Sequence, residues 1–347
     1  MGTTTGNRCR IGVWTLFWCM VLCGACDPNR IGNKQFNRHV EASTVDSDYT
    51  FDTEEYILIS TAINFPMYVN HDQAAFLRWG KARNVKTTIL GPSDWDVAAQ
   101  IAVIEQVIAA KPAGLLINGT DPGLAMAINK AVDAGIPTVV YDSDIPGSRR
   151  HAFLGTDWRE IGRLQAEAMA KLIEGKGKVA YLGILGMTNM EEGYLGMKAV
   201  FDSYPDIEFV GRYDDKASVE EAARITSDLL RAHPDLAGIC GFDAMSGPGI
   251  GLAIREAGQE GKVKVTTVDW EPEHLRLLKD GVVQHLVGQK RELFTWYGAQ
   301  FLFDMAHGVN ALSANDRKAG IVSIPYIVNT GLLEINASNI GQFLPGQ

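Results

Sequence analysis

The segment GLLINGTDPGLAMAINKAVDAGIPTVVYDSD, residues 114–144, decides the fold class because two apolar runs flank one helical pattern. The first run, residues 113–118, is continuously apolar, as expected for a parallel strand that is covered on both faces. A helical pattern follows, and Gly135 ends it. The second run, residues 138–141, delivers Asp142 to the carboxyl edge of the sheet, where open parallel sheets bind ligands. The segment therefore predicts a βαβ unit with polar groups at a ligand-binding edge.

The same alternation continues along the rest of the chain. Strand-like runs alternate with amphipathic patterns, and Gly or Pro marks the turns between them. This predicts α/β architecture with parallel sheets. Because the runs form two similar series, we expect two doubly wound parallel-sheet lobes, with a first crossing between them near Thr156 and Asp157. The first series is YILIST, VKTTIL, AGLLIN, PTVVYD and HAFLGT, and the second is KVAYLG, IEFVGRY, LAGICGF, KVTTVD and VQHLVG.

The first 26 residues have the pattern of a secretory signal peptide. A short basic region precedes an apolar segment, residues 11–25, that is too short to span a bilayer comfortably. The small residues before Cys26 resemble the lipobox of a bacterial lipoprotein, in which this thiol carries lipid after cleavage. An ordinary signal peptide or an uncleaved anchor that happens to contain cysteines is the alternative, because Cys23 stands where the lipobox usually has Leu. Residues 27–53 are polar and predict a flexible tether between membrane and domain.

Composition and motifs disfavour several function classes. The net charge of −9 and the pI near 5.3 argue against nucleic-acid binding, which needs a concentrated basic surface. The seven histidines have no metal-ligand spacing, so we expect no metal. The strand-like run that ends at Ser60 is followed by residues 61–68, which do not form a glycine-rich turn. This disfavours a dinucleotide enzyme. No GxSxG elbow or Walker loop is present, and we expect neither a cofactor nor enzymatic activity. Cys240 lies on an apolar run and is expected to be a buried core thiol.

Four stretches, in order along the chain, carry a family resemblance. They are Leu-Ile-Asn at 116–118, IPTVVYDSD at 136–144, Ala-His-Pro-Asp at 232–235 and VDWEPE at 268–273. Over residues 56–333 the chain resembles the ribose-binding-protein branch of the periplasmic sugar-binding proteins. The resemblance implies the type I periplasmic-binding fold, in which a three-segment hinge joins two lobes. It also implies the role of a solute-binding lipoprotein of an ABC transporter.

The resemblance further implies how the chain divides. The chain crosses back after Gln289 and crosses a third time near Ile321, so that the helix at 292–307 returns to the first lobe. Asp157, followed by Glu160, has the form of a capping box and is expected to cap a helix. The expected parts are a first lobe at 54–156 and 290–321, a second lobe at 157–289 and 322–335, and a C-terminal tail at 336–347.

Nine residues are candidate ligand contacts. Two carboxylates and two amides among them fall at strand ends and match sugar-contacting positions of the family. A carboxylate accepts hydroxyl hydrogens in charge-assisted bonds, whereas an amide both donates and accepts. Aromatic faces suit the apolar C–H surface of a sugar ring. The alternatives are that the strand-end residues cap helices and that the aromatic residues pack in the core. The nine are Ser60, Phe65, Tyr68, Asn118, Asp142, Phe242, Asp269, Trp270 and Gln289.

Departures from the family pattern bear on the choice of sugar. Where ribose binders have an Arg after the strand-end Asp, this chain has Ser143, and where the family usually places another Arg it reads NMEEGYLGM. Phe242 aligns with the family's Asn, and Trp270 adds an aromatic side chain beside Asp269. Because both expected guanidinium groups are missing, we expect a more aromatic and less cationic pocket than a ribose site. Such a pocket suits a neutral sugar or polyol, such as a hexose, a methylpentose or a sugar alcohol.

These observations lead to one leading hypothesis and one alternative. The leading hypothesis is a lipid-anchored, monomeric solute-binding protein on the periplasmic or cell-surface side of the cytoplasmic membrane. It would capture a small neutral sugar or polyol between its lobes and deliver it to an ABC permease. The alternative is a receptor of the same fold that feeds a chemoreceptor or a sensor kinase. The leader disfavours a transcriptional regulator, and a glycosidase would need two carboxylates about 5 to 10 Å apart across the scissile bond.

Overall fold

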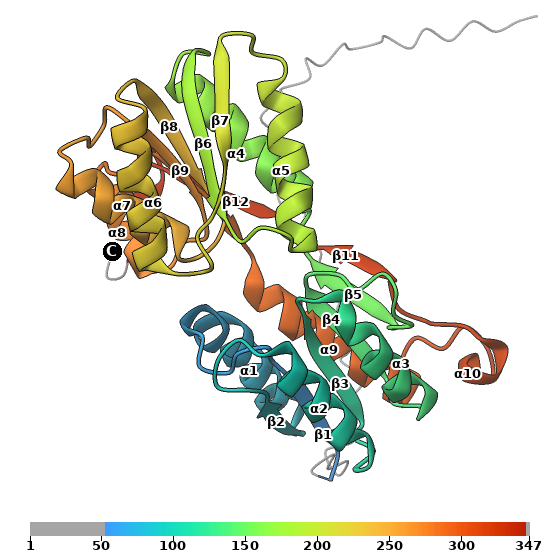
Figure 1. Ribbon diagram of the computed structural model, residues 1–347. Coiled ribbons are helices and arrows are strands. Elements are labelled where there is room, and N and C mark those ends of the chain that lie inside the picture. The colour runs from blue at the N-terminus through green and yellow to red at the C-terminus, as the bar shows by residue number, and fades with distance from the viewer. Residues whose placement is uncertain (1–52, 345–347) are drawn as a thin grey trace, which may run out of the picture. The chain divides into compact units, whose positions relative to one another are not determined.

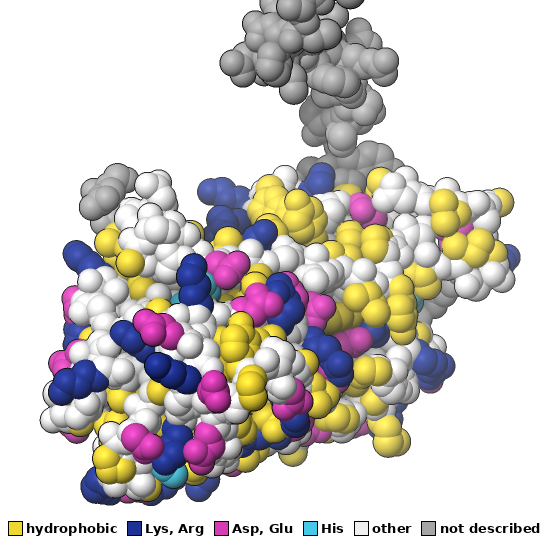
Figure 2. All heavy atoms as spheres, turned by 90° about the horizontal axis from the view of Figure 1, so that it is seen from above, with side chains coloured by type: hydrophobic (Ala, Val, Ile, Leu, Met, Phe, Trp, Pro, Cys, Tyr) yellow, Lys and Arg dark blue, Asp and Glu magenta, His cyan; other side chains and the backbone are white. Residues whose placement is uncertain are grey.

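The structure, a computed structural model, describes residues 53–344 (Figure 1). The expected signal peptide, the lipid-carrying Cys26 and nearly all of the expected tether lie outside the described residues. Within 53–344, no helix combines the length and the apolar character that crossing a membrane requires. On the face in Figure 2, acidic and basic side chains are interspersed. Many surface charges pair locally, as Arg163 does with Glu160 and Glu167.

The first lobe is built on a six-stranded sheet in the order β11-β5-β4-β3-β1-β2, in which every pairing is parallel. Helices cover both of its faces (Figure 1). Ile117 of β3 packs with α2 and α3, whereas its neighbour Leu116 packs with α1 and α9, as the alternation of a strand requires. The strands are β1 (Glu55–Ile59), β2 (Lys86–Leu90), β3 (Gly114–Gly119), β4 (Thr138–Asp142), β5 (Ala152–Gly155) and β11 (Ile327–Asn329). The helices are η1 (Tyr68–Gln73), α1 (Ala74–Arg83), α2 (Val97–Ile108), η2 (Pro122–Leu124), α3 (Ala125–Asp133), α9 (Arg291–His307) and α10 (Asp316–Ala319).

The second lobe repeats this plan in the order β12-β10-β9-β8-β6-β7, with β12 antiparallel to β10 at one edge. Ile239 of β8 packs with α6, α7 and α8, and Cys240 packs with α4 and α5 on the opposite face. The expectation of a buried core thiol is therefore confirmed. The strands are β6 (Gly177–Gly183), β7 (Ile207–Asp214), β8 (Leu236–Gly241), β9 (Lys264–Val268), β10 (His285–Gln289) and β12 (Leu332–Asn336). The helices are α4 (Trp158–Leu172), α5 (Thr188–Phe201), α6 (Val219–Ala232), α7 (Ser246–Glu256), α8 (Pro272–Lys279) and η3 (Ile340–Gln342).

The predicted architecture of two doubly wound α/β lobes is confirmed, and all ten strand-like runs form strands. The third crossing between the sheets lies later than the expected position near Ile321. β11 pairs with β5, with Ile327 opposite Phe153, so the crossing falls between Asn329 and Leu332. This strand could not be predicted from the sequence because three residues are too few to show a strand pattern.

Two smaller expectations concern the chain next to these crossings. Asp157 does cap α4, because its carboxylate accepts a hydrogen bond from the backbone N–H of Glu160 at 3.1 Å. The segment expected to be a C-terminal tail is in part structural. Ile340, Phe343 and Leu344 pack against the hydrophobic core of the second lobe.

Candidate ligand-binding cleft

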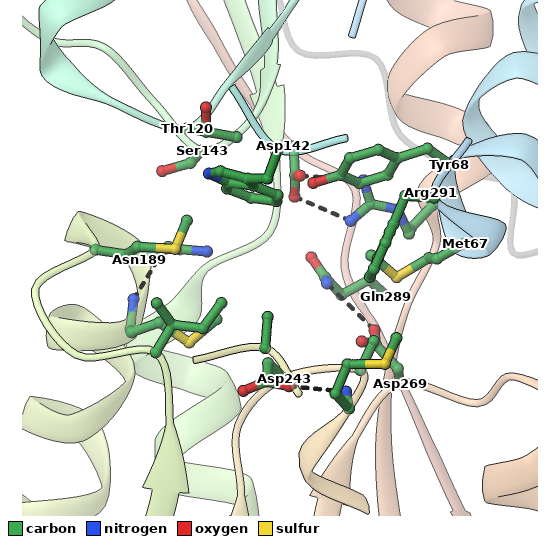
Figure 3. A pocket seen from close by; sticks show the side chains of 18 of the residues that line it. Met67, Tyr68, Thr120, Asp142, Ser143, Asn189, Asp243, Asp269, Gln289 and Arg291 are labelled. Atoms are coloured by element: carbon green, nitrogen blue, oxygen red, sulfur yellow. Dashed lines mark hydrogen bonds and ion pairs between the residues drawn. The ribbon is translucent and has the colours of Figure 1, made fainter. Parts of the chain in front are cut away.

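Strand ends and loops of both lobes surround one cavity near the crossings, with a free volume of about 50 Å³. In Figure 3 the carboxylates of Asp142, Asp243 and Asp269 lie around the same central space. The aromatic side chains that line the cavity come from Phe65, Tyr68, Trp95 and Trp158, and methionines complete the apolar part of the wall. The cavity thus combines anionic hydrogen-bond acceptors with apolar surface.

The two strand-end aspartates share an unusual backbone conformation. Asp142 is the last residue of β4 and has φ 77°, and Asp269 directly follows β9 and has φ 72°. Both values lie in the left-handed region that non-glycine residues rarely adopt. Such strain is concentrated at functional sites, where the surrounding structure enforces it. A Cβ atom on Gly119 would lie 2.0 Å from the carbonyl oxygen of Ser143, so only glycine permits β3 and β4 to approach in this way at the cavity.

Arg291, the first residue of α9, holds Asp142 in a buried ion-pair network. Its Nε and Nη2 donate to the two carboxylate oxygens of Asp72 at 2.9 and 2.7 Å. Its Nη1 and Nη2 donate to the carboxylate of Asp142 at 3.0 and 3.1 Å. These bonds use four of the five N–H groups of a guanidinium, which leaves one Nη1–H. Burial opposes the charge, yet the two carboxylates raise the pKa of Arg291 well above its usual value.

Asn118 also holds the carboxylate of Asp142, although Asn118 does not itself line the cavity. Its side-chain amide donates to Asp142 at 3.1 Å, while its oxygen accepts from the hydroxyl of Thr61 at 2.8 Å. Asn118 is fully buried. The orientation of the Asp142 carboxylate is therefore fixed by protein groups.

Asp269 has a different environment. It is buried, and its carboxylate accepts a long hydrogen bond of 3.5 Å from the amide of Gln289. No cationic side chain within the described residues forms an ion pair with it. Burial raises the pKa of Asp269 to about 7. Gln289 is itself oriented by the hydroxyl of Thr156, which donates to its side-chain oxygen at 2.9 Å.

The second lobe contributes another carboxylate and an unpaired donor. Asp243 accepts from the backbone N–H groups of Met245 and Ser246 at 2.7 and 3.0 Å. Asp215 lies beside Asp243, and burial together with the charge of Asp243 raises the pKa of Asp215 to about 8. Trp158 is 7% exposed, and its indole N–H has no hydrogen-bond partner among the described residues. An unpaired buried donor costs about 1–3 kcal/mol, so this N–H is a candidate donor to a ligand in the cavity that Trp158 lines.

Five of the nine predicted contact residues line this cavity: Phe65, Tyr68, Asp142, Asp269 and Gln289. Asn118 lies behind Asp142, as described above. Ser60 is buried, and its hydroxyl accepts from the backbone N–H of Ala62 at 3.3 Å.

Two predicted aromatic contacts lie elsewhere as well. Phe242 is fully buried and packs against Tyr181 with 4.6 Å between ring centroids, because its side chain enters the core between β8 and α5. Trp270 points away from the cavity: its indole N–H donates to the backbone oxygen of Gln289 at 3.2 Å, and its ring contacts Phe343. The structure therefore does not bring Ser60, Asn118, Phe242 and Trp270 to the cavity wall.

Several residues of the cavity were not predicted from the sequence. Arg291 is the most consequential, because it corrects the expectation of a less cationic pocket: a guanidinium is present but comes from the start of α9. The basic pair at 290–291, directly after a strand end, is the one sequence signal that could have indicated it. Asn189, Trp158 and Asp243 were also missed. Within residues 53–344, no group of three or more His, Cys, Asp or Glu side chains is arranged to hold a metal ion.

A charged clasp connects the lobes beside the cavity. His71 of η1 lies 2.6 Å from Glu271 of the second lobe through Nε2, and 2.6 Å from Glu292 of α9 through Nδ1. A carboxylate on each ring nitrogen requires both nitrogens to donate, so the ring is an imidazolium. Although burial favours the neutral ring, these hydrogen bonds raise the pKa of His71 to about 10. A small apolar cluster that includes Met67 and Ala244 also joins the lobes.

Comparisons with known proteins agree with this architecture. A family model described as the periplasmic binding protein domain matches residues 57–309. The D-ribose/D-allose-binding protein of Pseudomonas aeruginosa is 29% identical over 239 residues, which are 66% of this chain and 73% of that protein. The crystal structure of a sugar-binding protein of a sugar ABC transporter from Bacillus halodurans is 31% identical, with a TM-score of 0.77, and the match covers 84% of this chain and 100% of that one. The arabinose-binding protein AraP from Geobacillus stearothermophilus is 30% identical, with a TM-score of 0.73 and coverages of 84% and 99%.

Proposed function

Because the chain belongs to the family of periplasmic binding proteins, we propose that it captures a small neutral sugar or polyol between its lobes and delivers it to an ABC permease. The observation that carries this proposal is the cavity at the crossings, where both lobes present carboxylates beside aromatic rings. Carboxylates accept hydroxyl hydrogens, and aromatic faces cover the C–H surface of a sugar ring. The sugar-binding relatives support the same class of ligand. Their role in ABC transport supports delivery to a permease over signalling.

Each side chain has a distinct part in the proposed binding. Asp142, Asp269 and Gln289 contact the sugar hydroxyls, and the indole N–H of Trp158 donates to a sugar oxygen. Asn118 acts through Asp142, whose carboxylate it orients. A ligand that contacts both lobes stabilises their closed arrangement by its differential affinity for that arrangement. Binding and release thus require no covalent chemistry.

The proposal extends to the place of the protein in the cell. Relatives of the family act outside the cytoplasm, and we infer the same for this chain. Cys26 is the proposed lipid attachment site, on the periplasmic or cell-surface side of the cytoplasmic membrane. The protein would act there as a monomer, without nucleic acid or cofactor.

A thermal-shift screen of the purified protein against pentoses, hexoses, deoxy sugars and polyols tests the proposed function. A sugar present at one hundred times its dissociation constant stabilises the protein by about 2.7 kcal/mol, which raises the melting temperature by a few degrees. The shift is expected with a small set of sugars and is expected to shrink in Trp158→Phe, which keeps an aromatic ring and removes the N–H donor. Folded protein that responds to amino acids or nucleosides but to no sugar would refute the sugar assignment.

A further inference from the structure

A second cavity adjoins the first on the outer side of the cleft. It has a free volume of about 650 Å³, compared with about 50 Å³ for the inner cavity. The two share wall residues from both lobes, so they are continuous: Phe65, Trp95, Thr120, Ile184, Met187 and Ala217. Pockets that hold small ligands measure about 300–1,000 Å³. The outer chamber lies within this range, so the cleft offers a ligand room beyond the inner cavity.

The outer chamber is present although the lobes already touch. The clasp of His71 with Glu271 and the apolar contact between Met67 and Ala244 both cross from one lobe to the other. The outer chamber is therefore present in an arrangement in which the two lobes are already in contact.

Trp95 forms an aromatic platform in the wall of the chamber, on a loop that backbone hydrogen bonds hold in place. It is 44% exposed and lies in the loop between β2 and α2. Backbone hydrogen bonds from Ile63 to Pro92, at 2.8 Å, and from Asn64 to Ser93, at 3.4 Å, tie this loop to the loop that carries Phe65. A Cβ atom on Gly91, where φ is 147°, would lie 2.2 Å from the carbonyl oxygen of Ser60, so this close approach of the loops requires glycine.

The rest of the chamber wall mixes apolar and polar groups in the manner of a carbohydrate subsite. Met187 and Ile184 of the second lobe also line it, and so do polar side chains such as Asn64, Asp121 and Lys216. An exposed indole face next to hydrogen-bonding groups suits a ring with C–H groups on its faces and hydroxyls at its rim.

We propose that the cargo is longer than one sugar ring, with one ring in the inner cavity and a second, glycosidically linked ring against Trp95 in the outer chamber. This inference rests on the proposed function and specifies its ligand as a disaccharide or a longer sugar. The inner carboxylates recognise the first ring, and Trp95 with the polar rim recognises the second.

Isothermal titration of the wild-type protein with disaccharides and with their component monosaccharides tests this inference. The panel contains maltose, cellobiose, lactose, melibiose, sucrose and trehalose, together with glucose, galactose and fructose. For the preferred disaccharide, we expect an affinity at least about tenfold above that of its better monosaccharide, which is the scale of one aromatic platform. The ratio of the two affinities is the readout. It is expected to fall to within about threefold in Trp95→Ala and to stay near the wild-type value in Trp95→Phe, which keeps an aromatic face.

Each outcome separates this inference from the proposed function. If a monosaccharide binds as tightly as every disaccharide, or if Trp95→Ala weakens both ligand lengths equally, the second subsite is wrong and the sugar-binding function stands. If no sugar of either length binds to folded protein, the proposed function fails as well. The wild-type ratio decides the point even if a Trp95 variant does not fold.

Discussion

Asp142 and Asp269 occupy matching places in the two lobes but have opposite electrostatic surroundings. Each lies at the carboxyl end of the third strand of its sheet, β4 or β9, and each has the same left-handed backbone. Asp142 is held by Arg291 and Asn118, whereas Asp269 accepts one long hydrogen bond from Gln289. The two lobes thus place a carboxylate at the same position, but its charge is compensated in different ways. In the first lobe Arg291 compensates the charge of Asp142, whereas in the second lobe solvent or a ligand must supply the partner of Asp269.

Replacement of Arg291 by Met should have the largest effect, because it removes the partner that distinguishes Asp142. Asp142 and Asp72 would then be buried carboxylates without their cation. Breaking a buried ion pair in this way destabilises a protein by about 3–5 kcal/mol. The free energy of unfolding in urea at pH 7 measures the loss. An unchanged midpoint and slope would mean that the network contributes nothing to stability and that the contrast with Asp269 is only geometric.

Asp269→Asn should change the pH dependence of stability. Asp269 keeps its proton up to about pH 7 in the folded protein and loses it near pH 4 when unfolded. Between these values the folded state binds more protons, so the free energy of unfolding of the wild type falls as pH rises from 4 to 7. The asparagine variant lacks this fall, and it should be more stable than the wild type by about 2–4 kcal/mol at pH 8 and equal to it at pH 4.

Urea unfolding at several pH values between 4 and 8 gives this difference. Asp215 and Asp72 titrate with the same sign, but they are present in both proteins and cancel in the comparison. Two curves that run parallel over the whole range would show that Asp269 ionises in the folded protein as it does in water. The two strand-end aspartates would then be electrostatically alike.

The two aspartates could be found from the sequence because each directly follows an apolar run, and the position of such a residue at the sheet edge depends only on local pattern. Arg291 could not be assigned to Asp72 in this way. The two residues are 219 positions apart, and their contact exists only after α9 has returned to the first lobe. Phe242 illustrates the opposite error: it aligned with a contact position, yet its side chain enters the core. Local pattern predicts where a backbone position lies but not where a large side chain points.

Asn118→Leu should have a smaller effect, because it removes one neutral donor from Asp142 and leaves the guanidinium in place. The variant keeps a similar volume but leaves the hydroxyl of Thr61 and one oxygen of Asp142 with fewer partners. An expected loss of about 1–3 kcal/mol follows from unpaired buried polar groups. Urea unfolding measures it, and titration with the sugar found in the screen should show weaker binding although Asn118 does not line the cavity. Weaker stability with unchanged affinity would mean that Asn118 supports the fold and has no part in orienting Asp142.

His71→Gln should affect stability no more than Asn118→Leu does, and it tests whether the two strand-end aspartates are held together across the lobes. His71 precedes Asp72, and its partner Glu271 lies two residues after Asp269, so the clasp ties the two carboxylate-bearing segments together. Glutamine cannot donate to both glutamates with a positive charge, and a loss of about 1–3 kcal/mol is expected. The more informative measurement is X-ray scattering of the ligand-free protein, in which the radius of gyration should increase as the lobes separate. His307→Gln is the matched control, because the contact of His307 with Glu54 lies within the first lobe. If both variants scatter like the wild type, the clasp does not hold the lobes together, and Asp142 and Asp269 are brought to one cavity by the hinge segments and the ligand alone.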